Sequence, residues 1–440
     1  MKKQITKPSI LPGFMELLPA DQIQFNRMLD TIRRNYEKYG FVPLDTPVIE
    51  KSEILLAKGG GETEKQIYRF TKGDTDLSLR FDLTVPLARY VAQRFSDLNF
   101  PFRRYHIGKV YRGERNQRGR FREFYQCDID IIGNGKLSLI YDAEIPSIIY
   151  STFSDLDFGP LLIRINNRKL LNGFFESIGI ENKTDILRTI DKLEKAGEED
   201  VIKELESQGI EAPNVEKIMT FIGIKGNNDD MLAELEKLGI DNPLFREGLQ
   251  ELAEVVHYIR CFNVPEDSFA IDLTIARGLD YYTGTVYETI LKDYPDIGSI
   301  CSGGRYDNLA EYYTQNKLPG VGISIGLTRL FYQLKEAGIL GEEQASTLSQ
   351  VLIIPMDDTV EYGISVGNRF RERGIIAQLH LDKGKLGKKL AYADKMGIPY
   401  AVLLGSEERE NGKVSLKNLK TGSQESLTVD EAVIRIQSQD

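Results

Sequence analysis

The sequence of 440 residues predicts an α+β domain that carries a helical insertion and is followed by a C-terminal α/β domain. Three observations lead to this prediction. Residues 102–133 have the composition of two β-strands joined by a basic, glycine-containing loop. Residues 167–264 change to short helical patterns rich in lysine and glutamate. After residue 350, apolar strands alternate with helices, which predicts a parallel βαβαβ sheet covered by helices.

These changes of pattern divide the chain into five predicted segments. The segments are the first part of the α+β domain (1–166), the insertion (167–264), the second part of the α+β domain (265–337), a linker (338–350) and the C-terminal domain (351–440).

Composition excludes several classes of protein. A formal net charge of −10 and a pI near 5.2 disfavour indiscriminate nucleic-acid binding but leave room for a local basic groove. The three cysteines are far apart and form no CxxC pair, which is typical of reduced thiols in a cytosolic protein and predicts no zinc site. No apolar run approaches the roughly 20 residues that span a bilayer. The first ten residues lack the apolar segment of a signal peptide. We therefore expect a cytoplasmic location.

Near the N-terminus, apolar residues at spacings of three and four predict a helix from Asp21 to about Gly40. The following segment, FVPLDTPVIE, is predicted to be extended because Pro43 and Pro47 both disfavour helix.

The basic loop concentrates positive charge. Residues 102–122 hold eight basic side chains and one carboxylate, Glu114, a balance of 8 − 1 = +7. The basic residues are Arg103, Arg104, Lys109, Arg112, Arg115, Arg118, Arg120 and Arg122.

Side chains of a strand alternate between its two faces. One predicted face of the second strand is polar, with Arg120, Arg122, Phe124, Gln126, Asp128 and Asp130. The other is mostly apolar and suits a core, with Phe121, Tyr125, Cys127, Ile129 and Ile131. The polar face suits a molecule with phosphate at one end and an amine or imidazole at the other, because guanidinium groups bind phosphate with forked donors. The alternative is a solvated hairpin face, which the order of residue types makes less attractive.

Three motifs carry a resemblance to a known family. Y-R-G-E at 111–114 and G-R-F-R-E-F-Y-Q-C-D at 119–128 resemble the second signature motif of class II aminoacyl-tRNA synthetases in its histidyl form. R-G-L-D-Y-Y-T-G at 277–284 and S-G-G-R-Y-D at 302–307 resemble the two histidine-specific motifs of histidyl-tRNA synthetases. Together these motifs, in this order, are highly specific, and the resemblance covers nearly the whole chain.

The resemblance implies an architecture and an activity. The fold would be a class II catalytic domain, an antiparallel sheet with flanking helices, followed by an anticodon-binding domain. The helix and proline-bearing strand at 21–50 resemble the first class II motif, which in the family forms a homodimer interface. The activity would convert L-histidine and ATP, with Mg²⁺, to histidyl-adenylate and pyrophosphate, and then esterify the 3′ end of tRNA(His). The inserted domain would contact the tRNA acceptor arm.

The resemblance also implies roles for residues toward ATP. Arg112 and Arg277 would meet the α-phosphate as catalytic residues. Glu114 would lie near adenine or magnesium, and Phe124 would stack on adenine. The outer phosphates would be held by Arg120, Arg122 and Arg329, of which Arg329 lies at the start of a predicted helix, where an unsatisfied N-terminus favours phosphate.

Toward histidine, the resemblance implies that the amine is held by Asp82, Thr84 and Gln126. Asp130 and Tyr282 would recognise the imidazole, with Tyr281 and Tyr306 beside it. Many bacterial members carry glutamate where this chain has Asp82, and its D-L-T sequence resembles the eukaryotic-type branch.

Alternatives stay open at several points. A regulatory subunit of ATP phosphoribosyltransferase shares the catalytic fold, but it typically lacks the C-terminal domain and degrades the R-G-L-D-Y-Y motif, both of which this chain keeps. A generic RNA-binding module is disfavoured by the acidic pI.

Two groups of residues also allow alternative interpretations. Gly303 and Gly304 allow a tight turn or close approach of a ligand. A solvated face is the default for four C-terminal lysines, and the resemblance favours tRNA contacts for them: Lys383, Lys385, Lys388 and Lys389.

Overall fold

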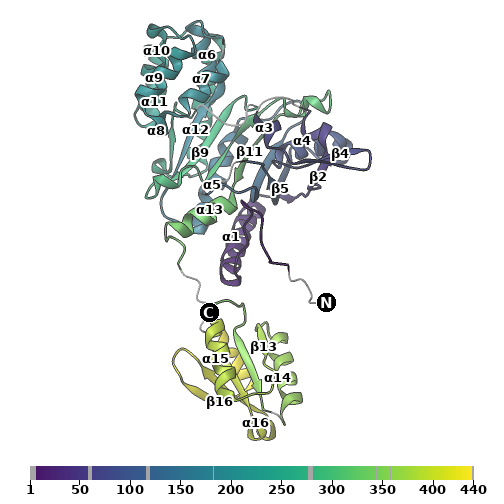
Figure 1. Cartoon of the computed structure of the whole chain (residues 1–440). Helices are drawn as coiled ribbons and strands as arrows, with labels where there is room; N and C mark the ends of the chain where they lie inside the picture. The colour runs from purple at the N-terminus through teal and green to yellow at the C-terminus, as the bar shows by residue number, and fades with distance from the viewer. Residues whose placement is uncertain are drawn as a thin grey trace. The chain divides into compact units, whose positions relative to one another are not determined.

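The computed structural model describes residues 6–57, 62–114, 119–181, 183–275, 281–341, 345–356 and 358–438 (Figure 1). Two compact units make up the chain. The first is Met1–Met15 with Leu29–Leu340, and the second is Glu16–Met28 with Gly341–Asp440. Helix α1 (Pro19–Lys38), predicted from Asp21, contributes residues to both units.

An eight-stranded sheet in the order β1-β5-β6-β11-β10-β9-β7-β8 forms the centre of the first unit. The six inner strands pair antiparallel, as predicted, whereas β1 runs parallel to β5 and β8 runs parallel to β7, so the sheet is mixed. The strands are β1 (Val42–Pro43), β5 (Phe102–Tyr111), β6 (Glu123–Ile132), β7 (Leu161–Asn167), β8 (Phe269–Ile271), β9 (Thr285–Leu291), β10 (Cys301–Tyr306) and β11 (Gly320–Ile325).

One face of this sheet is apolar and packs against helices. Cys127, Ile129 and Ile131 of β6 are fully buried, as the alternation predicts. Tyr36 of α1 donates a hydrogen bond of 2.9 Å to the Cys127 carbonyl. Tyr287 of β9 donates one of 2.7 Å to the Asp142 carbonyl of α5 (Ile140–Leu156). The opposite face is therefore left for polar side chains.

A second, three-stranded sheet has the order β2-β4-β3, and its strands β3 and β4 form an antiparallel hairpin. The elements of this region are β2 (Ile49–Lys51), α2 (Ser52–Leu55), α3 (Glu62–Gln66), β3 (Arg69–Lys72), β4 (Thr75–Leu79) and α4 (Thr84–Gln93).

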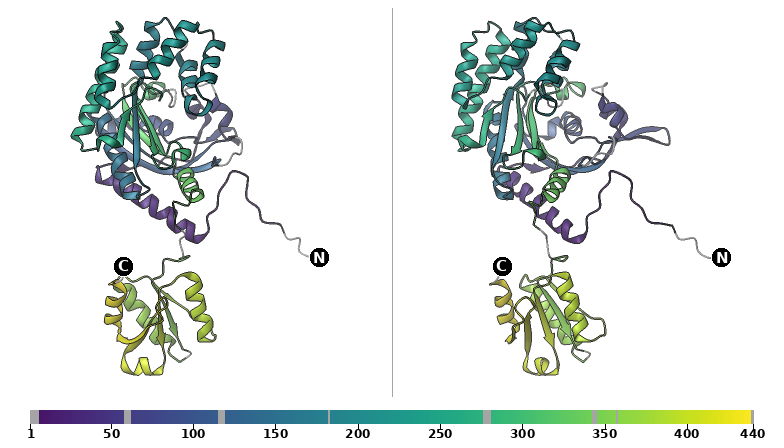
Figure 2. Two further views of the ribbon diagram at one scale, coloured as in Figure 1. Left: turned by 90° about the vertical axis from the view of Figure 1, so that its left-hand side faces the viewer. Right: turned by 60° about the vertical axis from the view of Figure 1, so that its left-hand side comes forward.

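In the described part of the segment between β7 and β8, seven helices form the connection, and Figure 2 shows this teal part of the chain as a helical module. Parallel strands need a long crossover connection, and this module provides it. Its core includes the stacked rings of Phe174 and Phe221, whose centroids are 4.0 Å apart. The helices are α6 (Arg168–Ser177), α7 (Lys183–Ile190), α8 (Leu193–Ala196), α9 (Glu198–Ser207), α10 (Ala212–Ile222), α11 (Asn228–Lys237) and α12 (Pro243–Cys261).

The second unit holds a separate five-stranded sheet in the order β13-β12-β14-β15-β16. Its first three strands are parallel and confirm the predicted βαβαβ pattern, whereas the antiparallel β15–β16 hairpin, α16 and α17 were not predicted. The elements are β12 (Val351–Pro355), α14 (Val360–Glu372), β13 (Ala377–Leu379), α15 (Leu386–Met396), β14 (Tyr400–Leu404), α16 (Ser406–Asn411), β15 (Lys413–Asn418), β16 (Gln424–Thr428) and α17 (Val429–Gln437).

One of the four C-terminal lysines differs from expectation. Lys389 is 7% exposed because it lies on the buried side of α15, whereas Lys383, Lys385 and Lys388 are exposed. Helix α13 (Leu327–Glu336) and short 3-10 helices complete the described elements. The 3-10 helices are η1 (Phe95–Asp97), η2 (Glu266–Ser268), η3 (Pro295–Ile297) and η4 (Leu309–Tyr312). Within the described part of the chain, no helix combines the length and apolar character that crossing a membrane requires.

Candidate active site

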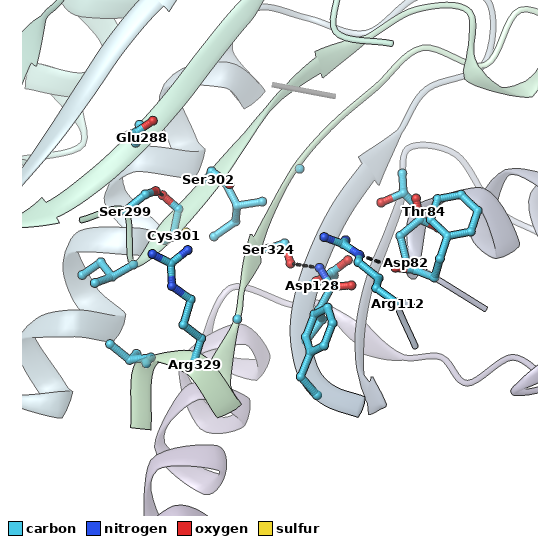
Figure 3. Close-up of a pocket in the computed structure, with 18 of the residues that line it drawn as sticks. Asp82, Thr84, Arg112, Asp128, Glu288, Ser299, Cys301, Ser302, Ser324 and Arg329 are labelled. Atoms are coloured by element: carbon cyan, nitrogen blue, oxygen red, sulfur yellow. Dashed lines mark hydrogen bonds between the residues drawn. The ribbon is translucent and has the colours of Figure 1, made fainter. Parts of the chain in front are cut away.

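A cavity of about 590 Å³ opens on the polar face of the large sheet. Figure 3 shows Asp82, Thr84, Arg112 and Asp128 at one end of it, and Glu288, Ser299, Ser302 and Arg329 toward the other. Of the fourteen predicted site residues, twelve line this cavity. They are Asp82, Thr84, Arg112, Glu114, Arg120, Phe124, Gln126, Asp130, Tyr281, Tyr282, Tyr306 and Arg329.

Strand β6 provides the wall of the cavity by simple alternation. Phe124, Gln126, Asp128 and Asp130 all line it, spaced two residues apart. The order of side chains along the strand therefore becomes an order of chemical groups along the wall, from an aromatic ring through an amide to two carboxylates.

Arg122 departs from the predicted face. Its Nε donates to the Glu114 carbonyl at 3.0 Å and its Nη1 donates to the Pro12 carbonyl at 3.4 Å, so the side chain is directed away from the cavity. Strand β6 begins only at Glu123, and strict alternation does not extend into the preceding residues. For the same reason Phe121, predicted for the core, lines the cavity.

The second predicted catalytic arginine, Arg277, lies outside the described residues, as do Arg115 and Arg118 of the basic loop. Their predicted roles therefore stay predictions.

Arg112 is held on two sides. Its Nε donates to the Phe81 carbonyl at 3.0 Å, and its guanidinium carbon lies 5.2 Å from the centroid of the Phe124 ring. Fixing the guanidinium in this way means that little reorganisation is needed when an anion arrives. Arg120, more exposed, pairs with Glu114 at 3.2 Å.

Arg329 lies in the first turn of α13 (Leu327–Glu336), where the sequence predicts it. Its Nε donates to Gln333 Oε1 at 3.2 Å. Burial and the nearby Arg120 lower the pKa of Arg329, so this end of the cavity favours an anionic ligand.

Asp130 is anchored by two donors. Tyr306 donates to its Oδ1 at 2.5 Å, and Arg104 Nη2 lies 2.6 Å from its Oδ2. Gly322, its partner on β11, leaves room for the carboxyl, because a Cβ there would lie 2.7 Å from Asp130 Cγ. Burial raises the pKa of Asp130 and the Arg104 charge opposes that rise.

Three tyrosines enclose the same end of the cavity. The ring centroids of Tyr281 and Tyr282 are 4.9 Å apart, and those of Tyr281 and Tyr306 are 5.8 Å apart. Burial raises the pKa of each of the three hydroxyls, so they stay neutral and able to donate. Gly304 serves this packing rather than a tight turn. It lies within strand β10, and a Cβ there would lie 2.9 Å from the Tyr282 ring.

Asp82 lies just before α4. Its Oδ1 accepts a hydrogen bond of 3.0 Å from the Val85 backbone N–H, in the manner of a helix cap. Burial raises the pKa of Asp82 to about 6, although that hydrogen bond and the Arg112 charge act in the opposite direction.

Several residues of the wall were not in the predicted set. Asp128 lies on the predicted polar face but was given no role, and burial raises its pKa to about 7. Ser324 and Glu288 come from β11 and β9, and only strand pairing brings them to the cavity. The signal for Asp128 was present in the alternation of β6, whereas nothing local in the sequence identifies the other two.

Two family models match consecutive parts of the chain. A family model described as histidyl-tRNA synthetase matches residues 13–330, and one described as an anticodon binding domain matches residues 350–439. A histidine–tRNA ligase of Clostridium tetani is 69% identical over 433 residues, which cover 98% of this chain and 99% of that relative.

Solved structures extend the comparison to the fold. The histidyl-tRNA synthetase of Nostoc sp. PCC 7120 matches with a TM-score of 0.91 at 43% identity and covers 100% of both chains. A Bacillus halodurans protein described as an ATP phosphoribosyltransferase regulatory subunit/histidyl-tRNA synthetase matches with a TM-score of 0.74 at 19% identity, over 88% of this chain and 97% of that one, and shows a shared fold alone. This chain belongs to the histidyl-tRNA synthetase family.

Proposed function

We propose that the protein is a histidine–tRNA ligase. The observation that supports this best is one cavity that joins fixed guanidinium groups to a buried enclosure of carboxylates and tyrosines. The first set suits the phosphates of ATP, and the second suits a small amino acid with a cationic amine and a ring bearing N–H groups. The regulatory-subunit alternative is disfavoured because identity to a curated ligase reaches 69% across nearly the whole chain.

In the activation step, a carboxylate oxygen of histidine attacks the α-phosphorus of ATP. The bond between the α-phosphorus and the bridging oxygen breaks, and pyrophosphate leaves. No group on the protein has to form a covalent bond, so catalysis rests on positioning and on stabilising the charge that develops on the α-phosphate. We assign the stabilisation of that charge to Arg112, which lines the cavity beside the Phe124 ring, with Arg277 as its partner.

ATP enters as its magnesium complex, so that the metal is part of the substrate. We assign its outer phosphates to Arg120 and Arg329 and adenine to Phe124. Glu114 is the carboxylate nearest to adenine or the magnesium ion. Arg122 donates its hydrogen bonds to backbone carbonyls. Its side chain would have to change direction before it could bind ATP.

Histidine occupies the enclosed end. Asp130 faces an imidazole N–H, and its orientation is fixed beforehand by Arg104 and Tyr306. Tyr282 contributes a neutral hydroxyl, and Tyr281 packs beside it. Asp82, Thr84 and Gln126 lie on the side of the amine.

In the transfer step, the 3′-terminal hydroxyl of tRNA(His) attacks the carbonyl carbon of the adenylate and AMP leaves. We assign recognition of the anticodon to residues 351–440 and contact with the acceptor arm to residues 167–264. The reaction takes place in the cytoplasm, and the protein acts as a homodimer through residues 21–50.

Amino-acid-dependent exchange of pyrophosphate into ATP tests the proposal. The wild-type protein is assayed separately with each of the twenty amino acids. We expect strong exchange with histidine alone. Equal exchange with a second amino acid, or none with histidine, would refute the assignment.

A further inference from the structure

Three buried oxygens of the cavity wall accept no hydrogen bond from the described residues. They are Asp82 Oδ2, Gln126 Oε1 and Asp128 Oδ1. The three residues are only 2%, 9% and 2% exposed, respectively. A buried acceptor without a donor is costly, so an oxygen that faces a cavity in this state points to a donor supplied by a ligand.

Hydrogen bonds hold the side chains that carry two of these oxygens, and strand pairing sets the position of the third residue. The other oxygen of Asp82 is held by the Val85 N–H at 3.0 Å. Gln126 Nε2 donates to Ser324 Oγ at 2.7 Å, which leaves Gln126 Oε1 directed elsewhere. Asp128 lies opposite Ser324 in the pairing of β6 with β11, on the same face as Gln126. Figure 3 shows Asp82 and Asp128 with Arg112 at the same end of the cavity.

Charge distinguishes Asp128 from its neighbour Asp130. Asp130 is paired with the guanidinium group of Arg104 at 2.6 Å. Among the residues that the structure describes, no ion pair of Asp128 lies within 4.0 Å, although it shares the face with Asp130 and is fully buried. A buried carboxylate of this kind requires a positive partner.

We propose that Asp128 is a further histidine-binding residue, and that Asp82, Gln126 and Asp128 together receive the three N–H donors of the α-ammonium group. A primary ammonium has three donors and one positive charge. The wall offers three acceptors that no described residue pairs with, two of them on carboxylates. This inference rests on the proposed function for the identity of the ligand and adds a residue that the sequence left without a role.

The variant Asp128→Asn tests it, because it removes the charge while keeping the size of the side chain. In the exchange assay we expect the KM for histidine to rise about 10- to 100-fold, as for loss of a hydrogen bond to a charged group. The KM for ATP should change less than about twofold. Glu123→Gln is the matched control. Glu123 is a carboxylate at the start of the same strand, paired with Lys109 at 2.7 Å and not part of the cavity wall.

Two inhibitors separate the ammonium from the imidazole. Histamine keeps the ammonium and the ring but lacks the carboxylate, whereas 3-(imidazol-4-yl)propionate lacks the ammonium. We expect Asp128→Asn to weaken inhibition by histamine about 10- to 100-fold and to leave inhibition by the propionate within about twofold of wild type. An equal loss for both compounds, or no loss for histamine, would overturn the inference.

Separate control experiments test whether the variant is folded and whether the wild type has the proposed activity. Thermal unfolding and circular dichroism establish that Asp128→Asn is folded, and Asp128→Ser is used in its place if it is not. If the wild type shows no histidine-dependent exchange, the proposed function fails. If the wild type is active and a folded variant keeps its affinity for histamine, only the role of Asp128 fails.

Discussion

Arg104 Nη2 lies 2.6 Å from Asp130 Oδ2, and the two side chains are 0% and 4% exposed. They come from neighbouring strands and occupy paired positions of the β5–β6 hairpin. The ion pair thus holds a carboxylate in a fixed position beside Tyr281, Tyr282 and Tyr306. Removing either partner should therefore lower the free energy of unfolding.

Replacing Arg104 with methionine should destabilise the fold. Loss of one partner of a buried ion pair leaves the other charge buried and unpaired, which costs about 3–5 kcal/mol. Urea unfolding at pH 8 measures the change. Arg33→Met removes an exposed pair with Asp30 and should cost less than about 1 kcal/mol. Similar losses in both variants would contradict the buried pairing.

The contribution of Asp82 and Asp128 to stability should fall as the pH rises from about 4 to about 7. Burial raises the pKa of Asp128 from 3.8 to about 7 and that of Asp82 to about 6. The folded chain therefore binds more protons than the unfolded chain in this window, so the contribution of each group is present below pH 4 and lost as the pH passes its folded pKa. Each pKa unit corresponds to about 1.4 kcal/mol. In Asp128→Asn the part of the pH dependence that comes from this group, between about pH 4 and 7, should be lost relative to wild type. If the free energy of unfolding of Asp128→Asn depended on pH as it does in wild type, the raised pKa of the buried Asp128 would be contradicted.

Histidine binding should release protons near pH 6.5. A cationic ammonium next to Asp82 and Asp128 favours their ionised forms and lowers both pKa values. Calorimetry in two buffers of different ionisation enthalpy measures the number of protons released. Asp128→Asn should release fewer, and an unchanged number would indicate that the proton comes from another group.

Arg277→Ala should slow activation by about 10²–10³-fold, the usual effect of losing one preorganised donor to a developing charge. Exchange at saturating ATP and histidine is the measurement. Arg373→Ala, which changes a half-exposed arginine of the second unit, is the control. A rate near wild type for Arg277→Ala would remove this residue from the mechanism.

Changing Lys383, Lys385 and Lys388 together to glutamate should impair tRNA charging and leave histidine-dependent exchange intact. These lysines are exposed and can contact phosphates, whose attraction weakens steeply with salt. Lys420→Glu, on the β15–β16 turn, controls for added negative charge. Full charging by the triple variant at raised salt would contradict a role in tRNA binding.

The local patterns could be predicted from the order of residues alone. Alternation along residues 123–132 placed Phe124, Gln126 and Asp130 on one polar face, because side-chain direction in a strand follows from the backbone alone. The periodicity of apolar residues likewise predicted α1 and the βαβαβ core of the C-terminal unit.

Which distant side chains come into contact depends on how the strands and helices pack together. Ser324 and Gln126 are 198 residues apart in sequence, and their hydrogen bond exists because β11 pairs with β6. The direction of the Arg122 side chain is set by hydrogen bonds to the backbone carbonyls of Glu114 and Pro12. The alternation of β6 does not apply to it, because that strand begins one residue later. The unpaired oxygen of Asp128 is likewise invisible in the sequence, because the desolvation and pairing of a buried group depend on every element packed around it.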